Sequence, residues 1–281
     1  KLLSKFMGFD SAYKAGNFII SHDMNYYALM IVLSGSPLKN PTKDIQIPEG
    51  KTLIETVAIL SAQGYIDEGK FIRIAKKETE VFNFLKDVKA TNNREYPLEG
   101  YLYPDTYRMD EGWTEQDLVD RMLNEFHRIF KQDFYDRAEE LGMTIDEVVT
   151  LASLIEMEAV HPADYKKISS VFHNRLKSQD LTLLQCDATI QYARIYEGLG
   201  RTSAVLNKDL EINHPYNTYK FKGLPPGPIC SPRIDAIEAA LYPEKTNYYF
   251  FFATPEGENI YNETFDGHNR DQQKYGVSGF N

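Results

Sequence analysis

Glu158 is the residue whose type and position best suit it to proton transfer. It ends the run LASLIEME (residues 151–158). On a helix it lies one turn from Leu154 and Ile155, so its carboxylate should project from the apolar face, whereas Glu156 lies on the other face. A carboxyl group on the core side of a helix is costly unless it is paired or protonated through a raised pKa. A general acid working near neutral pH needs such a pKa; the alternative is a Glu salt-bridged at the core edge.

Capping patterns and apolar periodicity predict the helix that carries Glu158 and the elements around it. Thr144 followed by Glu147 is a capping box, and His161-Pro162 should stop the helix at about Val160. The further elements predicted in this way are helices at Asn25–Leu33, Thr52–Gly64, Glu68–Lys77, Ala163–Lys177, Ala188–Tyr196 (N-capped by Asp187) and Ser231–Leu241 (Ser231 as N-cap, Pro232 first), strands at Gly16–Ser21 and Asp44–Pro48, and a hairpin at Tyr248–Asn262.

Four further segments carry unusual polar and aromatic groups. The segment 99–107 combines three Tyr with an acid beside Gly and Pro, and can be a turn-strand corner or a sugar-contacting surface. The segment 185–189 places Asp187 at a helix start, as a plain cap or a substrate contact. The loop 214–229 is rich in Pro and Gly beside Tyr-Asn-Thr-Tyr, which favours a functional interpretation. The segment His268-Asn269-Arg270 predicts a helix start at the edge of the cleft that the other segments would form. Taken alone, a surface His-Asn pair is more often structural.

The composition of the chain excludes several classes of function. The chain has 281 residues, a net charge of −10 and an abundance of Tyr and Phe. An acidic chain is a poor partner for a nucleic-acid backbone, which is bound through Lys and Arg. No nucleotide, metalloprotease or serine-hydrolase motif occurs, and His161 and His173 lack ligand spacing, so no cofactor or metal is expected. Cys186 and Cys230 can form one bridge if they meet, or remain two buried thiols.

The expected fold class is α+β in three parts. Residues 1–42 are a small α/β segment, residues 43–90 a strand–helix–helix unit with the layout of a glycan-binding LysM-like module, and residues 91–281 a mixed helical catalytic domain with a small sheet or hairpin. The longest apolar stretch, Tyr26–Leu33, is too short to span a bilayer. Because the chain opens at Lys1 rather than Met, we expect a trimmed chain, and a missing anchor here says little about the natural protein.

Together, six motifs resemble the YceG-like (MltG) family of endolytic murein transglycosylases, over about residues 95–275. They are LASLIEME (151–158), VFHNRL (171–176), QCD (185–187), PYNTY (215–219), GLPPGPI (223–229) and HN (268–269). The resemblance implies a membrane protein with a LysM-like module, an extracytoplasmic transglycosylase domain and a catalytic Glu158. Three positions depart from the family pattern: Cys186 and Ala188 flank the motif Asp, where Ser and Pro are common, and Ala159 replaces a common Thr. The last change argues against a hydroxyl role at that position but not against the acid.

The resemblance also implies a mechanism. Protonated Glu158 would donate to the oxygen of the MurNAc–GlcNAc β-1,4 bond and then, as carboxylate, take the proton of the C6 hydroxyl of the same MurNAc, which closes a 1,6-anhydro ring. The substrate-binding candidates are Glu99, Tyr103, Gln185, Asp187, Tyr216, Asn217, Thr218, Tyr219, Pro226, Gly227 and His268. With Tyr101, the residues Tyr103, Tyr216 and Tyr219 could line sugar subsites on both sides of the cleaved bond.

The sequence leaves two alternative functions open, and it also leads us to expect certain partners and a location. A lysozyme-like hydrolase would use Asp187 or Glu99 as a second carboxylate facing Glu158, and a non-catalytic glycan-binding cell-wall scaffold would use neither. The expected partners are peptidoglycan glycan strands and the cell-wall synthesis machinery, without nucleic acid. The expected location is the extracytoplasmic face of the bacterial membrane, through a single N-terminal anchor helix that this chain lacks, where the enzyme would terminate or trim nascent strands.

Overall fold

The fold is known from a computed structural model, which describes residues 9, 12–16, 18, 20, 24–35, 42–77, 82–86, 88 and 93–277. The contacts between residues divide the chain into two compact units. The first consists of residues 1–45 and 108–113, and the second consists of residues 46–107 and 114–281. All the candidate site residues belong to the second unit.

The first unit contains one helix, α2 (Tyr26–Ser34), among its described residues. The side chain of Asn25 caps this helix by accepting from the backbone N–H of Ala28 at 2.9 Å, which confirms the helix predicted from Asn25. The strand predicted at 16–21 lies partly outside the described residues, and residues 16, 18 and 20 are not in a strand. The strand predicted at 44–48 is present as β1 (Thr42–Gln46), which pairs with β2 (Thr106–Asp110).

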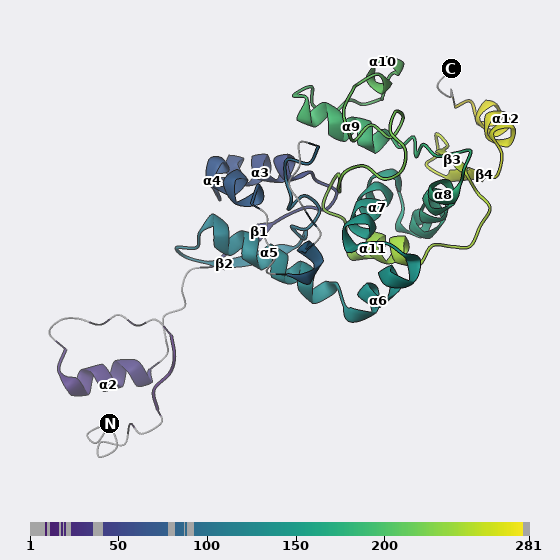
Figure 1. The fold of residues 1–281 in the computed structure, drawn as a ribbon. Helices are drawn as coiled ribbons and strands as arrows, with labels where there is room; N and C mark the ends of the chain where they lie inside the picture. Colours follow the sequence, from purple (N-terminus) through teal and green to yellow (C-terminus); the bar gives the residue numbers. More distant parts are fainter. Residues whose placement is uncertain are drawn as a thin grey trace. The chain divides into compact units, whose positions relative to one another are not determined.

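The second unit is built around α7 (Ile145–Glu158), which packs against α8 (Tyr165–Lys177), α9 (Asp187–Tyr196) and α11 (Ile234–Leu241) (Figure 1). Its predicted capping box is present, since Thr144 and Glu147 exchange side-chain and backbone hydrogen bonds. Every residue from Val148 to Glu156 is buried. The expectation of one apolar face was therefore wrong, because neighbouring helices cover α7 on all sides, the face of Glu156 included.

The remaining helices surround this core. They are α3 (Leu53–Ala62), α4 (Glu68–Ala75), the 3-10 turn η1 (Asn83–Leu85), α5 (Glu115–Ile129), α6 (Gln132–Leu141), the 3-10 turn η2 (Pro162–Asp164) and α10 (Asn207–Leu210). The capping box predicted at Thr52 is present and opens α3. Among the described residues, no helix is both long enough and apolar enough to cross a bilayer.

Two predicted helix starts were wrong. Asp187 is the first residue of α9 rather than its N-cap; the cap position is Cys186, and no side chain caps the helix. The helix predicted with Ser231 as its N-cap begins two residues later than expected, with Arg233 as its cap residue. There the carboxylate of Glu156 accepts from the backbone N–H of Arg233 at 3.2 Å, so a residue of α7 satisfies the end of α11 in place of a local Ser.

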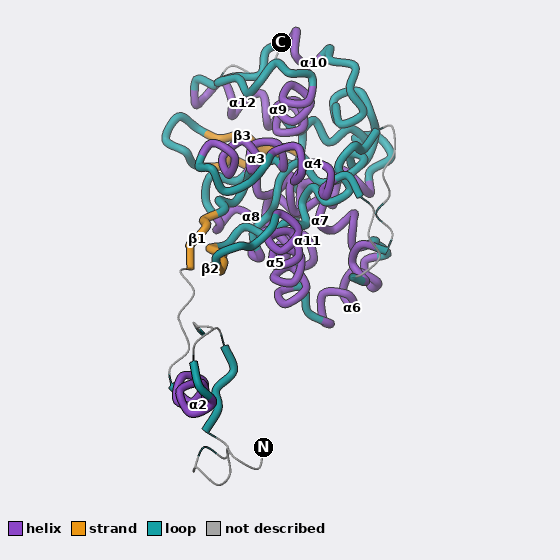
Figure 2. Tube along the Cα trace, turned by 90° about the vertical axis from the view of Figure 1, so that its left-hand side faces the viewer, coloured by secondary structure: helices purple, strands orange, loops and turns teal. Residues whose placement is uncertain are grey.

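The predicted hairpin is confirmed as β3 (Phe250–Ala253) and β4 (Asn259–Asn262), which run antiparallel with Phe250 opposite Asn262. The last helix, α12 (Phe265–Tyr275), packs on this hairpin, so His268 lies inside the helix rather than at its start. Figure 2 shows the two short sheets in orange among purple helices. The described residues thus form a mostly helical α+β fold with two small two-stranded sheets. The LysM-like unit at 43–90 stays a prediction.

Candidate active site

Glu158 is the last residue of α7, and its half-buried side chain faces the start of α9. Its Oε1 atom accepts a hydrogen bond from the Cys186 thiol, with Sγ and Oε1 2.9 Å apart. The backbone N–H of Ala188 donates to the same oxygen at a longer 3.4 Å. The carboxyl group of the candidate acid is therefore held by a thiol and by the N-terminus of a helix, whose free N–H groups and dipole favour negative charge.

The pKa of Glu158 is nevertheless raised. Burial of the carboxyl group is the largest cause, and the negative charge of Asp187 adds to it. The hydrogen bond from Cys186 and the backbone N–H groups of α9 act in the opposite direction. The net shift is toward the protonated form, which is the form that a general acid needs before the reaction.

Glu156 has a different environment, although it is only two residues away. Its side chain is 4% exposed, and its Oε1 atom lies 3.0 Å from Nε of Arg233. Burial raises its pKa, against the hydrogen bonds and charge of Arg233. An acid bound to an arginine and to the start of α11 has a structural role, so the structure separates the two acids by their partners rather than by helix face.

Thr218 connects the Tyr-Asn-Thr-Tyr loop to the segment that holds Glu158. Its hydroxyl accepts from the backbone N–H of Cys186 at 3.0 Å and lies 2.9 Å from the hydroxyl of Thr189. Its carbonyl accepts from the backbone N–H of Gln185 at 3.2 Å. Thr218 is 1% exposed, so its predicted importance lies, in this structure, in fixing the backbone of Cys186.

Asn217 and Tyr216 are also directed inward. The amide nitrogen of Asn217 donates to the carbonyls of Leu210 and Ile212, both at 2.8 Å, and its oxygen accepts from the N–H of Tyr219. Its exposure is 0%, and that of Tyr216, whose ring lies against the ring of Tyr192 at a tilt of 31°, is 2%. Both side chains organise the loop in this structure, and neither presents a free surface to a ligand.

Asp187 and Tyr219 remain half-buried beside Glu158. The hydroxyl of Tyr219 donates to Oδ1 of Asp187 at 2.5 Å. Burial raises the pKa of Asp187, and the hydrogen bond from Tyr219 lowers it. Asp187 belongs to the surroundings of the acid, because its charge raises the pKa of Glu158 and its neighbours Cys186 and Ala188 both donate to Glu158.

Arg175 is a residue that the prediction passed over. It is 8% exposed and donates to the carbonyls of Tyr249, Leu183 and Leu184, at 2.7, 3.1 and 2.9 Å. It also donates to the side chain of Gln185 at 3.1 Å. Gln185 has a φ of 51°, in the left-handed region where non-glycine residues are uncommon. The inward position of an arginine, at helical spacing from Ile168, Val171 and Phe172, was the available signal.

The Gly-Pro loop, residues 223–229, packs onto α7. The backbone N–H of Ile229 donates to the hydroxyl of Ser153 at 3.0 Å, and the carbonyl of Pro226 accepts from Arg94 at 3.5 Å. A Cβ on Gly227 would lie 2.7 Å from the guanidinium carbon of Arg94, so a side chain there would displace this buried arginine. The bond to Ser153 ties this loop to the helix that carries Glu158.

Glu99 and Tyr103 are not placed beside Glu158 by any contact among the described residues. Glu99 is 1% exposed; it accepts from the backbone N–H of Leu53 at 2.9 Å and from the hydroxyl of Tyr196 at 2.8 Å, and burial raises its pKa to about 7. Tyr103 is half-buried, and its carbonyl accepts from the Tyr107 hydroxyl. Tyr101, at 0% exposed, stacks on Phe84 in the core.

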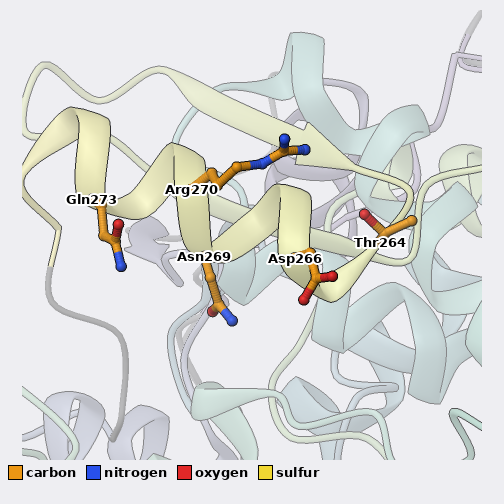
Figure 3. A pocket seen from close by; sticks show the side chains of 5 residues that line it. All are labelled: Thr264, Asp266, Asn269, Arg270 and Gln273. Carbon is orange, nitrogen blue, oxygen red and sulfur yellow. The ribbon is translucent and has the colours of Figure 1, made fainter.

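His268 is part of the contact between α12 and the hairpin. Its ring lies 5.5 Å from the ring of Phe250, and burial lowers its pKa. The outer side of α12 bears a polar hollow of about 560 Å³, lined by Thr264, Asp266, Asn269, Arg270 and Gln273. Figure 3 shows Asp266, Asn269 and Gln273 pointing to one side of this helix. None of the residues that line this hollow contacts Glu158 among the described interactions.

The described cysteines and acids form neither a disulfide nor a metal-ligand set. Cys186 and Cys230 are both free and buried. Within the described ranges, no three His, Cys, Asp or Glu side chains gather as a ligand set. The chemistry that this site can perform with its own groups is proton transfer by Glu158.

Comparison with known proteins gives a consistent result. Residues 1–274 match the model of the YceG-like family. The chain is 34% identical to the endolytic murein transglycosylase of Bacillus subtilis, over 94% of this chain and 74% of that protein. It is 32% identical to the endolytic murein transglycosylase of Streptococcus pneumoniae, over 95% of this chain but only 52% of that longer protein. A crystal structure of a protein described as yceG-like from Listeria monocytogenes has a TM-score of 0.69 and 31% identity, with coverage of 96% and 88%.

Proposed function

The chain belongs to the YceG-like family, and on that premise we propose that it is a peptidoglycan lytic transglycosylase with Glu158 as its catalytic acid and base. The proposed reaction cleaves the MurNAc–GlcNAc β-1,4 bond within glycan strands and leaves 1,6-anhydro-MurNAc ends. The observation that carries the proposal is the carboxyl group of Glu158, half-buried, with a raised pKa and held on one oxygen by Cys186. The relatives named endolytic murein transglycosylases support the substrate class.

The reaction needs one carboxyl group in two protonation states. Protonated Glu158 gives its proton to the glycosidic oxygen as the C1–O bond breaks and the GlcNAc hydroxyl leaves. The resulting carboxylate takes the proton of the MurNAc C6 hydroxyl, whose oxygen bonds to C1, so that the acid is regenerated and no water is consumed. Because the nucleophile belongs to the substrate, its effective concentration is high. The N-terminus of α9 favours the transient carboxylate.

The hydrolase alternative depends on a second carboxylate. Glu99 is a poor candidate, since its side chain is buried and bonded to Leu53 and Tyr196. Asp187 is near Glu158, but it is bound by Tyr219 on the helix that Glu158 already faces. Two opposed carboxylates must leave the cleaved bond between them, so we favour the single-acid reaction.

We further propose that the protein works at the extracytoplasmic face of the bacterial membrane, on glycan strands that the cell-wall synthesis machinery is extending. An N-terminal anchor helix and a LysM-like module at 43–90 would place the site on its substrate. The names of the relatives support this location. The chain spans about half the length of the pneumococcal relatives, so their further parts are outside this proposal.

The direct test is digestion of purified glycan strands, with the new ends identified by mass spectrometry. We expect 1,6-anhydro ends from the wild-type chain and none from Glu158→Gln. Binding to strands without any new ends would instead support the non-catalytic glycan-binding scaffold. An exclusive release of disaccharides from the start would argue against cleavage inside strands.

A further inference from the structure

We propose that Cys186 is the positioning residue of Glu158: its S–H bond to Oε1 makes Oε2 the oxygen that carries the catalytic proton. The inference rests on the proposed function of Glu158 and adds an atomic assignment to it. It concerns a side chain that touches the acid rather than the substrate, so Cys186 is not itself proposed as a catalytic residue.

The assignment follows from where the two donors point. The Cys186 thiol, at 2.9 Å, and the Ala188 N–H, at 3.4 Å, both donate to Oε1. The backbone N–H of Asp187 also lies close enough to the carboxyl group to favour its ionised form, but among the described residues no hydrogen bond within 3.5 Å is made to Oε2. A protonated carboxyl group has one oxygen that carries the hydrogen and one that accepts. Since Oε1 is occupied by donors, its own proton would collide with them, and the proton belongs on Oε2, which stays available to the glycosidic oxygen.

The backbone of Cys186 is fixed well enough to aim its thiol. Its N–H donates to the Thr218 hydroxyl at 3.0 Å, and its carbonyl accepts from the Thr189 hydroxyl at 2.7 Å. The preceding residue, Gln185, has the left-handed backbone noted above, and Arg175 holds its side chain. Cys186 is 2% exposed. A strained turn that is held from several sides and directs one side chain at an acid is a feature of preorganised sites.

The thiol is suited to donate in both states of the acid. Burial and the charge of Glu158 hold the pKa of Cys186 well above its usual range, so the group stays an S–H donor rather than a thiolate. When Glu158 gives up its proton, the bond to Oε1 becomes charge-assisted and stronger. Cys186 therefore stabilises the carboxylate that must next accept the C6 hydroxyl proton.

The test compares pH profiles of kcat/KM for three variants on purified glycan strands. Cys186→Ala removes a donor that favours the carboxylate, so the pKa of Glu158 should rise and the alkaline limb should move up by about one pH unit, with an about tenfold lower kcat. Cys186→Ser supplies a stronger O–H donor, so it should keep the rate and move the limb to lower pH. Cys230→Ala is the matched control, because this second buried thiol contacts Ser153 instead of Glu158 and should leave the profile unchanged.

An infrared measurement provides a readout that needs neither activity nor a stable alanine variant. The S–H stretching band that disappears in Cys186→Ser should shift in the wild-type chain as Glu158 ionises, and should stay in place in Glu158→Gln. A band that ignores pH, or an alanine variant with the wild-type limb and rate, would overturn the positioning role. So would an equal shift of the limb in Cys230→Ala. Failure of the proposed function would show separately, as a wild-type chain that makes no anhydro ends while its S–H band still responds.

Discussion

The hydroxyl of Tyr219 donates to the carboxylate of Asp187 at 2.5 Å, and this contact joins the Tyr-Asn-Thr-Tyr loop to the helix end that faces Glu158. The hydrogen bond from Tyr219 lowers the pKa of Asp187 and so favours its charged form. The charge of Asp187 in turn raises the pKa of Glu158. We therefore propose that Asp187, the candidate second carboxylate of a hydrolase, instead favours the protonated form of Glu158.

Asp187→Asn should therefore shift the pH dependence without changing the chemistry. Removing the negative charge lowers the pKa of Glu158, so the alkaline limb of kcat/KM should move to lower pH, while the new ends remain 1,6-anhydro. A pH series with end-group analysis measures both. Complete loss of cleavage at every pH would instead assign Asp187 a direct part in the reaction. Tyr219→Phe, which keeps the charge and loses the hydrogen bond, is the matched control.

The two acids of α7 should respond oppositely to the same substitution. Glu158→Gln removes the proton donor at a half-buried position, so cleavage should be lost while the melting temperature stays close to that of wild type. Glu156→Gln breaks the contact with Arg233, so it should lower the free energy of unfolding by about 1–3 kcal/mol and leave the folded enzyme active. Circular dichroism and the glycan assay on both variants test this. An inactive Glu156→Gln beside an active Glu158→Gln would exchange their roles.

Glu99 should make stability fall as pH rises. Its pKa is raised from 4.5 to about 7 by burial, so the folded chain keeps a proton that the unfolded chain loses over that interval. The stabilisation is present below about pH 4.5 and is lost as pH rises through about 7, by about 3 kcal/mol in total. Urea unfolding of the wild-type chain and of Glu99→Gln between pH 4.5 and 8 gives the difference between their free energies of unfolding. The contributions of the other titratable groups are common to both chains and cancel in this difference. A difference that is constant with pH would show that Glu99 does not titrate there.

Asn217→Ala should act first on stability. It would leave two part-buried carbonyls and one N–H without the partner they have now, which costs about 3 kcal/mol of the free energy of unfolding. Asn213→Ala, an exposed asparagine four residues earlier, is the control and should change little. Denaturant unfolding measures both. An unchanged stability with a raised KM would place Asn217 in direct contact with substrate instead.

Local sequence signals predicted the elements well where a signal was self-contained. The capping boxes at Thr52 and Thr144 and the turn at 255–257 each depend on neighbours within a few residues, and the structure confirms the helices and the hairpin that they predict. The starts of α9 and α11 were missed because the partners that set them are distant in sequence. Glu156 satisfies the start of α11 from 77 residues away.

The candidate site shows the same contrast between signals that are local in the sequence and contacts between distant residues. Glu158 could be selected from its motif, but the reason given, a single apolar face, depends on what covers the helix, which periodicity does not contain. Thr218 was found as part of an unusual loop, whereas its contact with Cys186 spans 32 residues. Cys186 was considered as a possible disulfide partner and as a departure from a family pattern but not as a partner of Glu158, because a thiol–carboxyl contact leaves no periodic trace in a sequence.

The most direct measurement is the identity of the ends made inside long glycan strands. Purified strands incubated with the wild-type chain should yield 1,6-anhydro-MurNAc ends, one water lighter than reducing MurNAc, with intermediate strand lengths appearing before small fragments. The Glu158→Gln chain should yield neither. A product population dominated by reducing MurNAc ends would contradict the account, because water, and not the C6 hydroxyl of the sugar, would then be the nucleophile.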